Sequence, residues 1–368
     1  MYDGRVARFV LVALALTSSC GLFPSLDGLS GDGGAADVVV GTDSGDAAPQ
    51  KDASDAAQAP DVDAGNPTYL RTITIHNNAQ TQLPSGYTIG VAFPESQLQA
   101  AISSGKMRSD LNDLRVKGSS GERDRLVDAP GMSQSGTRVV WFSLASSIAA
   151  TATDTTYAIT YGVPNAPAPP ADGSNVFTFY DDFVGSALDP HWITQGTVNV
   201  ANGLVTLPHG GFGALTTLAQ LPTSTCEFRA KITDPSSDPD NNTGFYYWFG
   251  FQHQGDFDAS EPWVLWIARG KTGIGAEDQA DGCLPNGCSN TPGTQTTSFR
   301  LYSIERQPTQ TIFGIDGTPW TTPATNDQAL SLMIRNYLVT GDLVVDWMRS
   351  RTRIYPEPTV TLGAEQTQ

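Results

Sequence analysis

Apolar side chains recur at every second position from Tyr69 onward, and this period constrains the fold more than any other feature of the chain. In YLRTITIHN, Ile73 and Ile75 fall on one side of an extended backbone, while Leu70 and Thr72 fall on the other. YTIGVAF repeats the pattern with a set of apolar residues on one side: Tyr87, Ile89, Val91 and Phe93. A period of two is that of a β-strand with one buried face. The segment therefore predicts paired strands.

The composition favours strands and turns over helices. Charged residues make up 16% of the chain, whereas Gly (37) and Pro (24) are frequent. Surface helices need charged residues on their solvent faces, while strands with polar neutral residues outward need few. One short helix is predicted in SQLQAAISSG, which follows Pro94 and Glu95. The formal net charge of −17 disfavours nucleic acid as a partner, because phosphate neutralisation needs clustered Lys and Arg.

The chain divides into four predicted parts. Residues 1–20 are a signal-type segment, residues 21–66 a disordered linker, residues 67–173 a β-rich domain and residues 174–366 an antiparallel β-sandwich. The linker holds nine Asp and one Lys and has no aromatic residue after Phe23, so it cannot bury enough apolar surface to fold. Pro-rich VPNAPAPPADG separates the two β domains as a stiff connector.

Residues 1–20 combine Arg5 and Arg8 with the short apolar run FVLVALAL, which is typical of an export signal. The stretch LTSSCG resembles a bacterial lipoprotein signal, and that resemblance implies lipidation of Cys20. We therefore expect a cell-envelope protein anchored to the outer membrane or cell surface through this lipid. The alternative is an ordinary cleaved signal and a secreted protein.

Two further resemblances concern the β domains. The run from YLRTITIHNN through KMRSDLNDLRV to TTYAITYGVPNA resembles a bacterial domain of unknown function, number 2341, over residues 68–173. That family implies a fold but no catalytic residues. FTFYDDFVGSALDPHW and the closing LVVDWMRSRTRIYPEPTVTLGAEQ resemble the paired first and last strands of concanavalin A-like lectin/glucanase (LamG-like) sandwiches. The expected fold class is all-β, with a jelly-roll sandwich in the second domain.

The cysteines support export to an oxidising compartment. Cys283 and Cys288 enclose a Pro-Asn-Gly turn that would bring them within disulfide range. Cys226, in the strand-like CEFRAKI, is interpreted as a buried, inert thiol. The four histidines are dispersed and no second close Cys/His pair occurs, so no metal site and no cofactor are predicted.

The aromatic segments GFYYWFGFQ and WVLWIAR carry the candidate binding site. In extended strands both faces of each segment are aromatic or apolar, so one face forms the core while the other is covered by loops or open to solvent. An open face would suit sugar rings, whose C–H faces stack on Tyr and Trp. The candidate ligand-binding residues are Tyr246, Trp248, Trp263 and Trp266.

The favoured function is non-catalytic binding of a polysaccharide or surface glycan, and two other classes remain open. A structural protein-interaction module of the envelope is one. A glycoside hydrolase is the other, since Asp256, Asp258 and Glu261 approximate a glucanase Glu-x-Asp-x-x-Glu spacing. Loop formers surround these acids, however, and retaining hydrolysis needs two carboxylates held ~5–5.5 Å apart by a rigid scaffold. Ca²⁺ could bind such an Asp-rich loop, but no EF-hand or calcium-repeat spacing occurs.

Overall fold

The computed structural model describes most of the chain from Thr68 to the C-terminus. The described residues are 68–132, 136–222, 224–233, 245–255, 257, 262–269, 279–284, 287–289, 297–323, 325–336 and 341–368, with side chains undescribed for 245–246, 268–269, 279–283 and 287–289. All of them belong to one compact unit, Val62–Gln368. The predicted signal segment with Cys20 and the predicted linker 21–66 lie outside the described residues.

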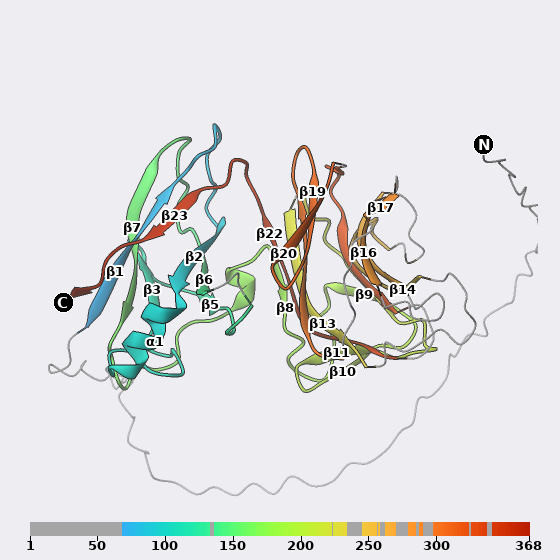
Figure 1. Cartoon of the computed structure of the whole chain (residues 1–368), viewed down its shortest axis with the longest axis horizontal. Helices are drawn as coiled ribbons and strands as arrows, with labels where there is room; N and C mark the ends of the chain where they lie inside the picture. The colour runs from blue at the N-terminus through green and yellow to red at the C-terminus, as the bar shows by residue number, and fades with distance from the viewer. Residues whose placement is uncertain are drawn as a thin grey trace, which may run out of the picture. The chain divides into compact units, whose positions relative to one another are not determined.

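The first module is built from two antiparallel sheets and one helix. A six-stranded sheet has the order β23-β1-β7-β3-β4, with β24 also on β1, and a three-stranded sheet has the order β2-β6-β5 (Figure 1). Its elements up to the connector are β1 (Tyr69–His76), β2 (Thr88–Pro94), α1 (Glu95–Ser103), β3 (Arg115–Gly118), β4 (Gly121–Arg123), β5 (Arg125–Val127), β6 (Thr137–Ser143) and β7 (Thr153–Tyr161).

The predicted alternation matches the burial in this module. Ile73 and Ile75 of β1 are fully buried, and every second residue of β2 packs with them in a single apolar core. The short helix α1 buries Leu98 and Ala101 against that core, as its spacing predicts. The period-two segments thus form strands because one face of each is removed from water.

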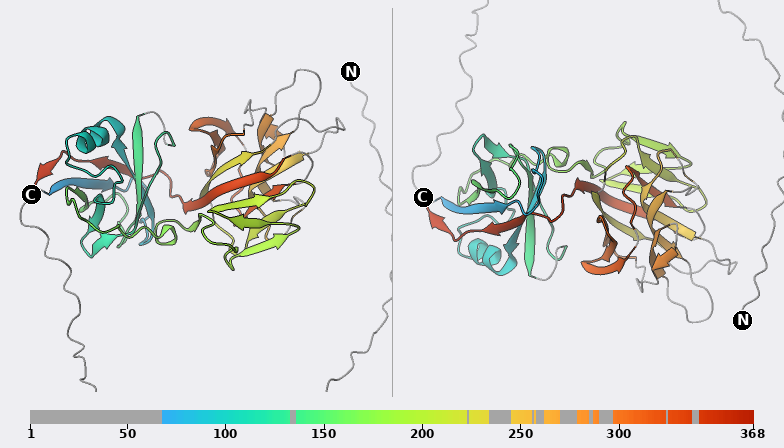
Figure 2. Two further views of the ribbon diagram at one scale, coloured as in Figure 1. Left: turned by 90° about the horizontal axis from the view of Figure 1, so that it is seen from below. Right: turned by 90° about the horizontal axis from the view of Figure 1, so that it is seen from above.

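The last two strands of the chain complete the first module. Both β23 (Thr359–Leu362) and β24 (Gln366–Thr367) pair antiparallel with β1. Figure 2 shows this C-terminal segment running from the sandwich back to the first module. The range 174–366 predicted for the sandwich therefore includes residues that belong to the sheet of the first module. The sandwich is inserted between β7 and β23.

The second module is a sandwich of two antiparallel sheets. The eight-stranded sheet has the order β10-β11-β22-β13-β18-β19-β20, with β8 also on β22. Its strands are β8 (Phe179–Asp181), β10 (Asn199–Ala201), β11 (Leu204–Leu207), β13 (Ser224–Ile232), β18 (Arg300–Arg306), β19 (Thr311–Ile315), β20 (Thr318–Thr322) and β22 (Leu343–Thr352). The pairing of β8 with β22 joins the two segments whose resemblance predicted it.

The facing sheet has seven strands in the order β17-β16-β15-β14-β21-β12-β9. They are β9 (Trp192–Gln195), β12 (Ala214–Thr217), β14 (Phe245–Gln252), β15 (Trp263–Arg269), β16 (Gln279–Leu284), β17 (Gly287–Ser289) and β21 (Ser331–Asn336). A continuous apolar core lies between the two sheets. The predicted all-β class, with one short α-helix and an antiparallel sandwich, is confirmed for the described residues.

A buried arginine joins the sandwich to the first module. Arg349 of β22 is 5% exposed, and its Nη1 donates to Asp128 Oδ1 of the first module at 2.7 Å. Its Nε donates to Glu227 Oε2 of β13 at 2.5 Å. Burial opposes the charge, but the Glu227 and Asp128 carboxylates outweigh it and raise the pKa of Arg349 above its ordinary value. The positive charge of Arg349 is therefore paired with the carboxylates of Asp128 and Glu227.

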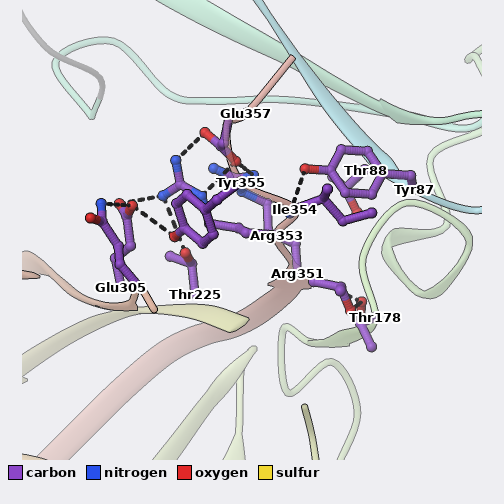
Figure 3. A network of polar contacts seen from close by, with 12 residues as sticks. Tyr87, Thr88, Thr178, Thr225, Glu305, Arg351, Arg353, Ile354, Tyr355 and Glu357 are labelled. Carbon is purple, nitrogen blue, oxygen red and sulfur yellow. Dashed lines mark hydrogen bonds and ion pairs between the residues drawn. The ribbon is translucent and has the colours of Figure 1, made fainter. Parts of the chain in front are cut away.

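A second polar network follows β22 along the connection to β23 (Figure 3). Arg353 forms ion pairs with Glu305 of β18 and with Glu357, and Tyr355 donates to Glu305 Oε1 at 2.9 Å. Arg351 Nη1 donates to Glu357 Oε1 at 2.8 Å. Burial acts to raise the pKa of Glu357, but Arg351 and Arg353 together hold it below its ordinary value. The ion pair with Glu305 thus holds the start of the connection to β18, and the pairs with Glu357 hold its two ends to each other.

Candidate functional site

The two faces of β14 and β15 have different surroundings. One face points between the sheets, where Phe249 and Phe251 pack with Val264. The other, which we call the outward face, carries a separate apolar cluster of Trp248, Leu265, Ile267 and Met333, with Trp263 packed against it. Because paired residues in antiparallel strands share a face, the registers Trp248↔Ile267 and Gly250↔Met333 join three strands in this surface.

Trp266 lies in the sandwich core and not on the outward face. Its side chain is fully buried, its ring packs edge-on against Phe313 at 5.3 Å, and its indole Nε1 donates to Ser303 O at 2.9 Å. Residue 266 alternates with the outward Leu265 and Ile267, so it must point the other way. The structure therefore separates Trp266 from the other predicted ligand-binding residues.

Trp248 and Trp263 do share the outward face. Trp248 is 9% exposed and Trp263 is half-buried, whereas Leu265 and Met333 beside them are fully buried. Residue 246 lies in β14, but its side chain is outside the described part of the chain. The open aromatic platform that the sequence allowed is thus absent among the described residues. Around Trp248 the face is covered, and Trp263 is its accessible residue on β15.

Two polar groups on this face lack hydrogen-bond partners, and the sequence did not point to either. Gln252 of β14 is fully buried, pairs in register with Trp263 and Ser331, and neither its Oε1 nor its Nε2 atom is hydrogen-bonded. Thr216 of β12 is opposite Met333, and its buried Oγ1 is also unpaired. A buried polar atom without a partner costs about 1–3 kcal/mol, so such atoms are rare in folded proteins.

One cation also lies on the outward face. Arg335 of β21 is opposite Trp248, and its guanidinium carbon is 5.0 Å from the centre of the Trp248 ring. It is 4% exposed. An arginine over an indole face fixes the ring and leaves its edges for other contacts. The face thus combines aromatic rings, an amide, a hydroxyl and a guanidinium.

The described side chains of the outward face include no carboxylate. Those on the five described strands are apolar, neutral polar or basic: Ile193, Gln195, Ala214, Thr216, Trp248, Gln252, Trp263, Leu265, Ile267, Ser331, Met333 and Arg335. Asp256, Asp258 and Glu261, the basis of the hydrolase alternative, lie outside the described residues. Across the described part of the chain, no group of three or more His, Cys, Asp or Glu could hold a metal ion.

The three cysteines of the sandwich each lie in a strand, as the sequence predicts for Cys226. The backbones of Cys283 and Cys288 are opposite each other in the β16–β17 hairpin. Their side chains lie outside the described residues, so the disulfide stays a prediction. Cys226 is a free, fully buried thiol, and burial raises its pKa well above the ordinary value. Its predicted inertness is consistent with that environment.

The described part of the chain shows no helix long and apolar enough to cross a membrane.

The charged residues that follow α1, among them Arg108 and Asp113, form a structural loop. Asp113 is 2% exposed and accepts from the backbone N–H groups of Arg108 and Gly162, both at 3.0 Å. Arg108 in turn donates to the carbonyls of Pro164 and Ala166 in the connector. These charges hold the loop and the connector together.

The comparisons with known proteins agree with part of the sequence analysis. A family model described as "Domain of unknown function (DUF2341)" matches residues 111–195, which run from the first module into the first strands of the sandwich. This supports the predicted resemblance over residues 111–173 and extends it to residue 195, whereas residues 68–110 lie outside the match. No curated protein matches the chain.

Several solved glucanase structures are distantly similar to about half of the chain. A β-glucanase of Bacillus licheniformis is 16% identical with a TM-score of 0.36, over 48% of this chain and 98% of its own. A laminarinase catalytic domain of Thermotoga petrophila is 12% identical with a TM-score of 0.35, over 48% and 97%. An antigen of Mycobacterium tuberculosis described as a pseudo β-1,3-glucanase is 14% identical with a TM-score of 0.37, over 48% and 99%. Likeness at this level carries no argument about activity, and the fold assignment rests on the strand pairings.

Proposed function

We propose that the outward face of the seven-stranded sheet binds a carbohydrate without hydrolysing it. The observation that carries this proposal is the buried Gln252 amide, which lies beside Trp263 with both polar atoms unpaired. An amide offers one acceptor and two donor hydrogens, and vicinal sugar hydroxyls need both kinds of partner. A ligand that forms hydrogen bonds with both amide atoms would offset the free-energy penalty of burying them.

The neighbouring residues suit the same ligand. Trp263 provides a flat apolar surface for the C–H face of a sugar ring, Trp248 presents a ring edge beside it, and the Thr216 hydroxyl adds another unpaired polar atom. Because Trp263 is accessible and is paired in register with Gln252, a glycan would enter there and extend toward Gln252.

Glycan-array binding by the wild-type chain and the Trp248→Ala variant tests the proposal. We expect the wild type to bind a defined set of glycans and Trp248→Ala to lose that binding, because the aromatic ring that packs beside Trp263 on the outward face is removed. The matched control is Trp266→Phe, which changes an indole in the core; it should lower the melting temperature but retain binding. Loss of binding in Trp266→Phe with full binding in Trp248→Ala would contradict the proposed site.

We further propose that the protein is exported and held at the cell envelope by a lipid on Cys20, with the acidic segment 21–66 as a tether. The support is the sequence of the signal-type segment and the low apolar content of the linker. Metabolic labelling with palmitate should mark the wild type and leave Cys20→Ser unmarked. An unlabelled wild type recovered from the medium would show a secreted protein instead.

A further inference from the structure

A cavity lies in the first module, among residues that do not belong to the outward face of the sandwich. It has a volume of about 550 Å³ and is lined by residues of α1, β1, β7 and the segment between β23 and β24. Figure 1 shows β23 beside β1 and the end of the chain near the start of β1. The C-terminal return therefore forms one wall of this cavity.

A buried cation that forms no ion pair with a described residue lines the cavity. Arg71 of β1 is 7% exposed, and its Nε and Nη1 donate to two neutral acceptors, Gly363 O and Gln97 Oε1, each at 2.7 Å. Its Nη2 donates no hydrogen bond to a described residue, and Arg71 forms no ion pair within the described part of the chain. Buried charges in proteins are normally paired, because desolvation of a lone ion is costly.

Hydrogen bonds from Lys106 and Tyr161, and more weakly the charge of Arg71, hold the pKa of Glu365 below its ordinary value, so Glu365 compensates Arg71 only in part. Glu365 is the one carboxylate among the lining residues, and it already pairs with Lys106 and accepts from the Tyr161 hydroxyl at 2.7 Å. Two cations and one carboxylate leave the lining with a net charge of +1 (2 − 1). The lining of the cavity therefore carries a net positive charge and several hydrogen-bond donors.

We propose that this cavity binds the oxyanion group, a carboxylate or a phosphate, of a small ligand. The guanidinium of Arg71 receives the anion, and charge-assisted hydrogen bonds from a guanidinium are among the strongest that proteins form. The exposed amide of Gln97 and the ammonium of Lys106 line the same space and add donors for the rest of the ligand. This proposal is independent of glycan binding by the sandwich, because it rests on other residues in another module.

The guanidinium carbon of Arg71 lies 4.9 Å from the centre of the Phe93 ring, and this contact uses the positive charge, whereas its two hydrogen bonds do not require one. The bonds of Arg71 to Gly363 and Gln97 link β1 to the C-terminal return and to α1. Neutral donors could serve both acceptors without leaving a buried charge. A buried guanidinium in the wall of a cavity is a suitable group for binding an anion.

Calorimetric titration of the full-length protein tests the proposal, with digalacturonate and inorganic phosphate as oxyanion probes and cellobiose as the neutral counterpart. Ala100 is exposed on α1 and lines the cavity, so Ala100→Phe should fill the space without touching a charge. We expect at least one oxyanion probe to bind the wild type and to bind about 10- to 100-fold more weakly in Ala100→Phe and Arg71→Gln.

The variant Gln252→Met, in the sandwich, should leave this binding unchanged and so separates the two sites. Competition between the probes identifies the anion: binding of digalacturonate that phosphate cannot displace assigns a carboxylate ligand, and displacement assigns a general oxyanion site. The proposal is overturned if neither oxyanion binds the wild type, or if the affinity is the same in Ala100→Phe.

Discussion

Arg349 and Gln252 are both buried polar side chains on strands of the sandwich, one in each sheet. Arg349 has two carboxylate partners, whereas both amide atoms of Gln252 are unpaired. The first arrangement joins two parts of the fold, and satisfied buried polar groups are the rule where a protein is only held together. The second leaves hydrogen-bonding capacity unused inside an aromatic face. The contrast separates a structural site from a candidate binding site.

The largest expected effect comes from breaking the satisfied site. Arg349→Leu leaves Asp128 and Glu227 without their cation and should lower the free energy of unfolding by about 3–5 kcal/mol, measured by denaturant titration. The matched control is Arg229→Leu, which removes a partly exposed pair with Asp346 and should cost at most ~1 kcal/mol. Equal losses in the two variants would show that the Arg349 junction has no special role.

The unsatisfied site should respond in the opposite direction. Gln252→Met replaces the amide by an apolar side chain of similar length, so the free energy of unfolding should rise by about 1–3 kcal/mol. Glycan binding should be lost in the same variant. Denaturant titration and a glycan array measure the two effects separately. A variant that is less stable than the wild type would mean that Gln252 has partners in the folded protein.

The local elements were predictable from the sequence, because each strand carries its own alternation. The short helix followed from the spacing of Leu98 and Ala101 after Pro94. Alternation showed that both faces of β14 and β15 carry large apolar side chains, but not which face was inward, and the prediction grouped Trp266 with Trp248 and Trp263. Both faces of β14 and β15 are apolar, so only the position of the opposing sheet decides, and that position depends on contacts distant in the sequence.

The pairing of the C-terminal strands with β1 was also not predictable. The short strand TVTL alternates too briefly to reveal its partner, and the resemblance to sandwich tails assigned it to the wrong module. Gln252 was missed because its sequence neighbours indicate only a strand end. Its two side-chain polar atoms are buried without hydrogen-bond partners, and this surrounding exists only once Gln252 is paired with Trp263 and Ser331 of other strands. Such a site can be recognised only after the strands are paired.

The side-chain amide of Gln252 offers the most direct test of the central claim. In nitrogen-15-labelled protein its Nε2 resonance can be assigned by comparison with Gln252→Met and followed during titration with a glycan that the array identifies. We expect this resonance to shift during the titration until the shift saturates at high ligand concentration, because the sugar supplies the missing hydrogen bonds. A glycan that binds the protein while the Gln252 amide resonance stays unchanged would contradict it.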